Sequence, residues 1–221
     1  MVCLGNFAYL LQAGRTMYTG IIQALCPVVA LITKPGLVSF FVEFPARLLS
    51  GLQTGASVAI DGVCFTVTCI ENNRVSFDAM QETLQKTTIG MLRQGDFVNI
   101  ERSAKMGDEI GGHPMSGHVS TIAQIVDVQE SENNKTMTFH VDPFWMRFIF
   151  SKGFIGLDGA SLTVVDVDKT KGTFNVWFIP ETLCLTRFGT KQAGDNVNVE
   201  IDAQTQVIVE TVERVLEARF K

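Results

Sequence analysis

The chain has 221 residues, of which 46% are hydrophobic and 19% charged, with 18 lysines and arginines against 23 aspartates and glutamates. This length fits one large domain or two of about 100 residues. The formal charge of -5 and the lack of a basic run exclude the electrostatic footprint of a nucleic-acid-binding protein. The charged fraction is below the usual value of about 25%, which favours extra apolar surface buried between subunits.

The sequence predicts neither a membrane span nor a disulfide framework. No run of about 18 apolar residues occurs, and no basic residue precedes the short apolar stretch at the start, which argues against a secretory signal. Five cysteines are an odd number, and they include no C-x-x-C pair. We therefore expect reduced thiols in the cytoplasm. The cysteines are Cys3, Cys26, Cys64, Cys69 and Cys184.

An internal repeat organises the chain. The first matching blocks are shifted by 97 positions (159 − 62) and the later ones by 99 (181 − 82). The two extra residues fall where a hairpin turn with Asn, Lys and Gly can absorb an insertion. The chain is therefore a tandem duplication. The matching blocks are 19–22 with 116–119, 60–67 with 157–164, 82–84 with 181–183, and 95–101 with 194–200.

Short β-rich runs in each copy predict an all-β fold. The Asp61-Gly62 and Asp158-Gly159 pairs are predicted to form tight hairpin turns with glycine at positive φ. Because the period is far longer than a solenoid unit, each copy is expected to close into its own barrel, which removes exposed strand edges. We thus expect two small, closed, Greek-key-like barrels in tandem. The expected strands of the first copy are 57–60, 64–70, 74–78 and 96–101.

The tail predicts one amphipathic C-terminal α-helix over residues 204–221. Ile208, Val212, Val215 and Leu216 follow helical spacing, and Glu210 precedes Arg214 by four residues, as a helical ion pair would. This stripe can pack on its own barrel or on another subunit, and the low charge favours the second. The expected division is a leader at 1–16, disordered and added ahead of the native start, barrels at 17–110 and 111–203, and a trimerisation helix.

The familiar phosphate and hydrolase motifs are absent from the sequence. There is no Walker loop, no H-E-x-x-H, no G-x-S-x-G and no dinucleotide fingerprint. His113 and His118 are five residues apart, which is not a usual ligand spacing, and no cysteine or carboxylate pairs with them. We expect no bound metal.

Small polar residues recur at one strand position of the two copies. Cys64 and Ser161 both follow the Asp-Gly turn, with Thr66 and Thr163 two residues later on the same strand face. They can line a pocket for an aromatic ligand, or they can be ordinary strand residues. His118 can transfer a proton near neutral pH, or serve as a hydrogen-bonded structural group.

Five blocks, in order and across both halves, resemble the riboflavin synthases of the bacterial type: 17–23 (MYTGIIQ), 55–68, 111–118 (GGHPMSGH), 152–163 and 198–202 (NVEID). The resemblance runs from Met17 to about Arg219. It implies a homotrimer held by the C-terminal helices, with each active site between the first barrel of one subunit and the second barrel of its neighbour. The implied reaction transfers a four-carbon unit between two molecules of 6,7-dimethyl-8-ribityllumazine, giving riboflavin and 5-amino-6-ribitylaminouracil without a metal or redox cofactor.

The resemblance also implies site residues. Ser57, Cys64 and Thr66 match positions that contact one lumazine, and Lys152, Ser161, Thr163, Ile179 and Asp202 match positions at the other. His118 matches a histidine that assists proton transfer or activates a nucleophile. The predicted catalytic set is Ser57, Cys64, His118, Lys152 and Asp202. The wider substrate-binding set adds Tyr18, Thr19, Gly20, Ile21, Val63, Gly117, Val119 and Leu162.

Two residues depart from the family pattern. Tyr18 stands where the family has phenylalanine, so its hydroxyl needs a partner if it is buried. Pro114 replaces a larger apolar residue and fixes the local backbone.

Other functions remain open. Luminescence antenna proteins resemble this family and hold one lumazine or flavin without turnover, but Lys152, Ser161 and Thr163 are all present here, which favours catalysis. A flavin-reductase barrel would need a following nucleotide-binding domain, which the predicted order lacks. Association with a lumazine synthase shell is a further open possibility.

Overall fold

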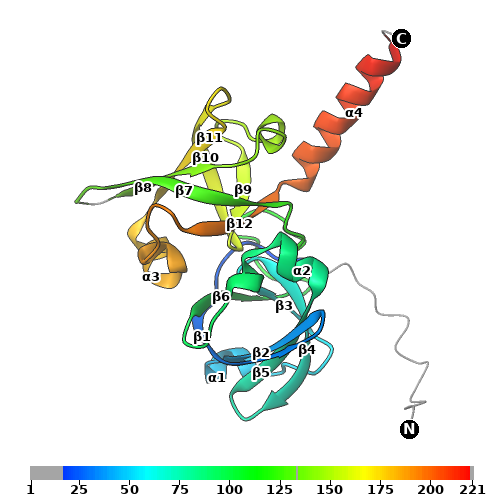
Figure 1. Ribbon diagram of the computed structural model, residues 1–221, viewed down its shortest axis with the longest axis vertical. Coiled ribbons are helices and arrows are strands. Elements are labelled where there is room, and N and C mark those ends of the chain that lie inside the picture. The colour runs from blue at the N-terminus through cyan, green and yellow to red at the C-terminus, as the bar shows by residue number, and fades with distance from the viewer. Residues whose placement is uncertain (1–16, 133, 220–221) are drawn as a thin grey trace.

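The computed structural model describes residues 17–132 and 134–219, so the predicted leader at 1–16 lies outside the described residues. The described chain forms two closed antiparallel barrels and a terminal helix (Figure 1). Around the first barrel the strands follow the order β1-β2-β5-β4-β3-β6. These strands are β1 (Ala24–Lys34), β2 (Leu37–Glu43), β3 (Ser57–Ile60), β4 (Val63–Glu71), β5 (Arg74–Met80) and β6 (Phe97–Arg102).

The second barrel repeats this topology, since its circular order β10-β11-β8-β7-β12-β9 pairs the equivalent strands. A short helix follows β5 in the first barrel, α2 (Gln81–Lys86), and another follows β11 in the second, α3 (Pro180–Leu185). The predicted duplicated all-β fold is confirmed. The strands are β7 (Thr121–Glu130), β8 (Lys135–His140), β9 (Phe154–Leu157), β10 (Ala160–Asp168), β11 (Thr173–Phe178) and β12 (Asn196–Ile201).

Alternating residues in β4 show how a strand of this kind builds a barrel wall. Val63, Phe65 and Val67 are buried inside the first barrel, whereas Cys64 is half-buried and Thr66 is exposed on the outer face. Phe65 meets the core ring of Phe40 edge to face, with centroids 5.1 Å apart. The outer face of the strand is left for other contacts.

The two Asp-Gly pairs form the predicted tight turns, with positive φ at both residues of each: 44° and 79° at Asp61 and Gly62, 42° and 83° at Asp158 and Gly159. The turns of the two barrels lie against each other. A Cβ atom added to Gly62 would lie 2.6 Å from the backbone nitrogen of Gly159. Glycine is required here by the close approach as well as by the backbone angles.

Four charged side chains meet at this junction, three of them buried and Arg187 half-buried. The fully buried carboxylates of Asp61 and Asp158 pair with Arg187 (2.7 Å) and Lys191 (3.2 Å), respectively, so both cations come from the second copy. Burial and the neighbouring Asp158 raise the pKa of Asp61 to about 6, although Arg187 opposes the rise. The cluster is neutral as a unit, which is how buried charges are tolerated.

The segments that precede the two barrels, residues 17–23 and 114–120, each cross to the other barrel and are called the crossing segments. The backbone oxygen of Gly20 accepts a hydrogen bond from the Ser161 amide (2.8 Å), and that of Gly117 accepts one from the Cys64 amide (2.9 Å). Tyr18 and Met115 pair through two backbone hydrogen bonds of 2.8 and 2.9 Å. The two copies are therefore interlocked near the duplicated positions that the sequence singles out.

The terminal helix α4 (Ala203–Arg219) begins one residue before its predicted start and extends away from both barrels (Figure 1). The Asp202 carboxylate caps it, accepting hydrogen bonds from the backbone amide (2.8 Å) and hydroxyl (2.6 Å) of Thr205. The predicted Glu210–Arg214 ion pair is wrong: in the described part of α4, Glu210 accepts from Gln206 instead. No helix of the described residues is long and apolar enough to cross a membrane.

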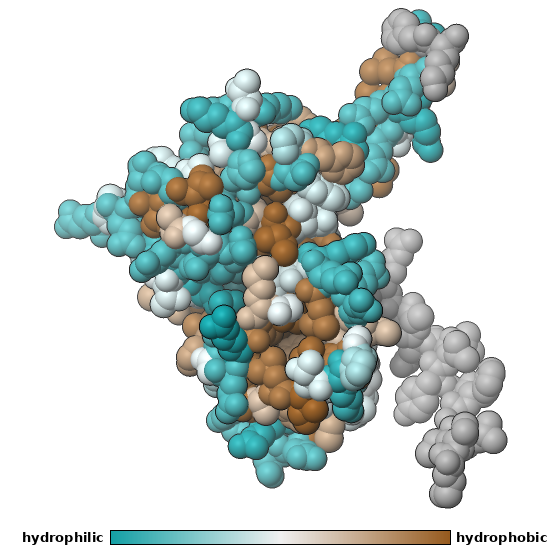
Figure 2. All heavy atoms as spheres, in the orientation of Figure 1, coloured by the Kyte–Doolittle hydropathy of each residue, from teal (hydrophilic) through white to brown (hydrophobic). Residues whose placement is uncertain are grey.

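The apolar stripe of α4 is largely uncovered, and Figure 2 shows apolar side chains along the projecting helix. Ile208, Val212 and Val215 are 62%, 52% and 58% exposed. Val209 packs against the second barrel core, and Glu213 pairs with Arg147 at 3.3 Å. Within the chain, the predicted stripe does not pack on its own barrel.

The remaining described helices are short. They are α1 (Ala46–Leu49), η2 (Thr88–Met91), η3 (Trp145–Phe148) and η4 (Arg187–Gly189).

Candidate functional site

Five predicted binding residues gather in one cleft of about 270 Å³ beside α2. Val63 and Cys64 come from the start of β4, and the other three come from the crossing segment of the second copy. Side chains of α2 close the opposite side, including Thr83 and Lys86. The cleft combines one thiol, one exposed imidazole, two valine side chains and the polar side chains in and after α2. The five residues are Val63, Cys64, Gly117, His118 and Val119.

Ser57 and Thr66 extend the outer face on which Cys64 lies. They are directly opposite each other in the β3–β4 pair, and Cys64 is two residues before Thr66. Thr66 is exposed, and Ser57 and Cys64 are half-buried. The predicted first-barrel set of Ser57, Cys64 and Thr66 therefore shares one surface.

Tyr18, Thr19 and Gly20 lie behind this surface and are buried. The Tyr18 hydroxyl donates a hydrogen bond to the sulfur of Cys64, with the two atoms 3.1 Å apart. Thr19 donates to a Glu101 oxygen from its amide (2.6 Å) and its hydroxyl (2.8 Å). Ile21, in contrast, is 47% exposed. The contribution of these four residues to ligand binding remains a prediction. The contacts of Thr19 with Glu101 attach the N-terminal crossing segment to the first barrel.

Glu101 and Glu200 hold the two crossing segments in the same way, and the sequence reasoning missed both. The Glu200 carboxylate accepts from the amide (2.6 Å) and hydroxyl of Ser116 and from the amide of Gly117. Burial raises the pKa of both glutamates, while these donors oppose the rise. The signal was available, because a glutamate closes the repeated block in each copy, 95–101 and 194–200.

Ser161 and Thr163 lie on the outer face of β10, opposite Gly156 and Phe154 of β9. The hydroxyl of Ser161 is hydrogen-bonded to Nδ1 of His113 at 2.6 Å, and the His113 ring stacks on Phe154 with centroids 5.1 Å apart. Burial lowers the pKa of His113, while Asp202 opposes the fall. His113 and Phe154 are thus part of the Ser161 surroundings, which the sequence reasoning did not predict.

The other predicted second-barrel residues are less closely grouped. Lys152 is an exposed turn residue with φ of 65° before β9, and Ile179 is 61% exposed at the start of α3. Leu162 turns inward and packs against the second core. Asp202 caps α4. Within the described residues, no hydrogen bond, ion pair or ring contact joins Lys152, Ile179 and Ser161. Because Lys152 and Ile179 are exposed, this set is open on one side.

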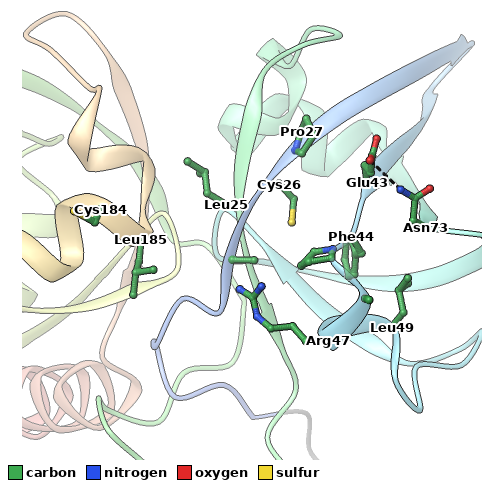
Figure 3. A pocket seen from close by; sticks show the side chains of 13 residues that line it. Leu25, Cys26, Pro27, Glu43, Phe44, Arg47, Leu49, Asn73, Cys184 and Leu185 are labelled. Carbon is green, nitrogen blue, oxygen red and sulfur yellow. Dashed lines mark hydrogen bonds between the residues drawn. The ribbon is translucent and has the colours of Figure 1, made fainter.

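Another hollow, of about 550 Å³, lies elsewhere, between the first barrel and α3 (Figure 3). Cys26, Phe44 and Arg47 line it, and none of the predicted site residues does. Burial raises the pKa of the Cys26 thiol to about 11. Among residues 17–132 and 134–219, no three His, Cys, Asp or Glu side chains are grouped so that they could hold a metal ion.

Comparison with known proteins gives the family. The lumazine binding domain matches residues 19–103 and again 116–202. The riboflavin synthase of Escherichia coli (strain K12) is 53% identical over 204 residues, covering 92% of this chain and 95% of the relative. The riboflavin synthase of Chlamydia pneumoniae is 42% identical over 205 residues, covering 93% and 100%.

Solved structures share the fold at lower identity. The crystal structure of LumP complexed with 6,7-dimethyl-8-(1'-D-ribityl) lumazine has a TM-score of 0.74 at 22% identity, covering 82% of this chain and 97% of that one. The complex of LumP with riboflavin gives 0.76 at 23% identity, covering 83% and 98%. At such identity the likeness shows the fold alone, while the sequence relatives show the family. The chain belongs to the riboflavin synthase family and carries the lumazine binding domain twice.

Proposed function

We propose that this chain is a riboflavin synthase that binds two molecules of 6,7-dimethyl-8-ribityllumazine and moves a four-carbon unit from one to the other, giving riboflavin and 5-amino-6-ribitylaminouracil. The observation that carries the proposal is the match of the lumazine binding domain to both copies, together with 53% identity to a riboflavin synthase. Holding two reactants side by side makes a bimolecular reaction effectively unimolecular. Two related barrels suit that task.

The first lumazine is assigned to the cleft beside α2. Its walls supply the Cys64 thiol and the exposed His118 ring, and the exposed Thr66 lies two residues beyond Cys64 on the same outer strand face. The reaction requires loss of a proton from the 7-methyl group of one lumazine, and the resulting charge spreads into the ring. Neutral hydrogen-bond donors aimed at the ring stabilise such a charge. His118 is assigned to proton transfer.

The second lumazine is assigned to the outer face of β9 and β10. Ser161, Thr163 and Phe154 offer a hydroxyl pair and an aromatic ring there, and Lys152 adds a positive charge. These residues are open on one side in the described chain, so a second subunit is assigned to complete the site. The first barrel of one subunit thus faces the second barrel of another.

The exposed stripe of α4 supports a homotrimer as the assembly that brings these barrels together. Ile208, Val212 and Val215 are all more than half exposed on a helix that leaves its own barrels. Burying such a stripe between subunits removes apolar area from water. Removing residues 204–221 should shift the mass measured by sedimentation from trimer to monomer, and an unchanged trimer would refute this assignment.

The activity is tested by incubating the purified protein with the lumazine alone. Riboflavin should accumulate, together with an equal amount of the ribitylaminouracil. A stable fluorescent lumazine complex without riboflavin would instead indicate a binding protein of the antenna type. His118→Gln should lower kcat more than it weakens lumazine binding, whereas equal losses would indicate a structural role for His118.

The position of the active site between subunits is tested by complementation. His118→Gln should impair the first-barrel side of the site, and Lys152→Ala should impair the second-barrel side. When the two variants are coexpressed, some sites pair two intact sides from different chains, so activity should recover. If each site lay within one chain, every site would carry one defect and no recovery would occur.

A further inference from the structure

The Tyr18 ring is 1% exposed, and its hydroxyl lies 3.1 Å from the Cys64 sulfur. Burial and the nearby Cys64 raise the pKa of Tyr18 far above its ordinary value, so the phenol keeps its proton and acts as the donor. The sulfur is therefore the acceptor in this contact. The buried hydroxyl, which the sequence left in need of a partner, finds it in a residue of the cleft wall.

The environment of Cys64 is fixed on two sides. Its backbone amide donates to the oxygen of Gly117 at 2.9 Å, and a Cβ atom at Gly117 would lie 2.6 Å from Cβ of Cys64 and 3.0 Å from the Tyr18 ring. Tyr18, Cys64 and Gly117 therefore form one compact unit behind the cleft. In such packing, a hydrogen bond to sulfur decides which way the thiol hydrogen is free to point.

We propose that Tyr18 is a positioning residue for the first-barrel site: its hydroxyl occupies the inner side of the Cys64 sulfur and leaves the S–H donor directed into the cleft, toward an acceptor atom of the bound lumazine or flavin ring. The inference rests on the proposed function for its ligand. The family pattern has phenylalanine at this position, so the aromatic ring is common to both and the hydroxyl is the group that adds the contact with Cys64.

The described residues of the second copy have no equivalent of the Tyr18–Cys64 hydrogen bond. Met115 occupies the position equivalent to Tyr18, and its thioether has no hydrogen to donate. Ser161, the counterpart of Cys64, is bonded to His113 instead, at 2.6 Å. The two lumazines have different roles in the reaction and would contact different groups. The first-barrel site offers the Cys64 thiol, which is hydrogen-bonded to Tyr18, and the second-barrel site offers the Ser161 hydroxyl, which is hydrogen-bonded to His113. The Tyr18 effect belongs to the first barrel only.

A double-mutant cycle tests the inference with riboflavin affinity, measured by quenching of riboflavin fluorescence, and with the KM and kcat of the lumazine reaction. Tyr18→Phe removes one hydroxyl and keeps the ring, so the chain should still fold. It should weaken riboflavin binding by about two- to tenfold, the range of one neutral hydrogen bond, and raise KM more than it lowers kcat. In a Cys64→Ala background it should add no further loss.

Ser161→Ala is the matched control background, because that residue is the second-copy counterpart of Cys64. Tyr18→Phe should cost as much there as in the unmodified chain. A loss of equal size in the Cys64→Ala background would show that Tyr18 acts through general packing, and no loss in the unmodified chain would also overturn the inference. If Cys64→Ala does not fold, Cys64→Ser keeps an acceptor, and Tyr18→Phe should again weaken binding in that background.

The two readouts separate this inference from the proposed function. If the protein bound riboflavin but made none from lumazine, the activity would fail while the affinity cycle still tested Tyr18. If activity were present and the cycle showed no coupling between Tyr18 and Cys64, the inference alone would fail.

Discussion

The side-chain amide of Asn198 donates a hydrogen bond to the backbone oxygen of Asp61, 2.8 Å away, and so joins the second barrel to the tight turn of the first. Asn99 makes the mirrored bond to the backbone oxygen of Asp158 at 2.9 Å. Each asparagine also accepts across the junction, Asn198 from the amide of Thr88 (2.8 Å) and Asn99 from that of Arg187 (3.0 Å). Polar side chains, used twice, thus hold the two barrels together.

Replacing Asn198 with alanine should weaken this junction. The change removes two hydrogen bonds and leaves a buried carbonyl and a buried amide without partners, so the free energy of unfolding should fall by about 2 to 4 kcal/mol. Urea denaturation measures the loss. Asn73→Ala is the control. Asn73 is exposed, and among the described residues its side chain forms a hydrogen bond only with Glu43, so a loss of less than about 0.5 kcal/mol is expected. Similar losses in both variants would contradict the role assigned to Asn198.

Arg187→Gln should make stability depend more steeply on pH. The pKa of Asp61 in the folded chain, about 6, is above its ordinary value, so the folded state binds this proton more tightly than the unfolded state. The contribution of Asp61 protonation to the free energy of unfolding is fully present at low pH and is lost as the pH rises through about 6. Without the Arg187 charge, the pKa of Asp61 rises further and more stability is lost at neutral and higher pH.

Urea denaturation between about pH 5 and pH 8 measures this difference, which should be about 3 kcal/mol at the upper end and small at the lower end. Arg187→Lys keeps the charge and should retain most of the unmodified pH dependence. A stability difference that stays constant across the range would show that Asp61 does not titrate as described.

Gly62→Ala should be much more destabilising than Gly95→Ala. Gly62 and Gly95 both have positive φ, of 79° and 93°, so alanine strains the backbone at either position. Only at Gly62 would the new Cβ atom also clash with backbone, that of Gly159; at Gly95 nothing lies within 4 Å. Gly95→Ala should cost about 1 kcal/mol, and Gly62→Ala at least about 2 kcal/mol more. Equal thermal shifts would argue against the close contact of the two turns.

Riboflavin should protect Cys64 from alkylation. Iodoacetamide labelling followed by mass spectrometry reads each cysteine separately, so the exposed Cys69 on the same strand serves as an internal control. At riboflavin concentrations tenfold above its Kd, Cys64 labelling should slow by about tenfold, while Cys69 labelling stays unchanged. Unprotected Cys64 would place the ligand outside the cleft beside α2.

Because the sequence is duplicated, the two-barrel architecture and the tight turn of each copy could be predicted from it. Equivalent turns at Asp61-Gly62 and Asp158-Gly159 fixed the register of one hairpin per copy, and the predicted strand 57–60 agrees with β3. The β1–β2 hairpin was not predicted, because its sequence is not repeated recognisably in β7 and β8. Local pattern alone cannot separate such apolar runs from buried helix.

The sequence predicts candidate site residues, and their roles remain predictions; the neighbours of these residues could be predicted only in part. Cys64 and His118 could be paired in advance only through the family resemblance, since they come from different copies. Phe154 and His113 beside Ser161 were missed, because ring stacking between residues far apart in sequence leaves no periodic trace. The inward turn of Leu162 follows from strand alternation, which places it on the face opposite Ser161.

The crossing segments bear on how the chain emerges from the ribosome. The strand that carries Cys64 is synthesised early, yet its amide partner, Gly117, belongs to the second copy and appears more than fifty residues later. Ser161 is in the opposite situation, because its partner Gly20 is already present when β10 is made. Domains made on the ribosome tend to fold in order from the N-terminus. Here all six strands of the first barrel end by Arg102, but the cleft beside α2 is complete only after Gly117, His118 and Val119 of the second copy have been synthesised.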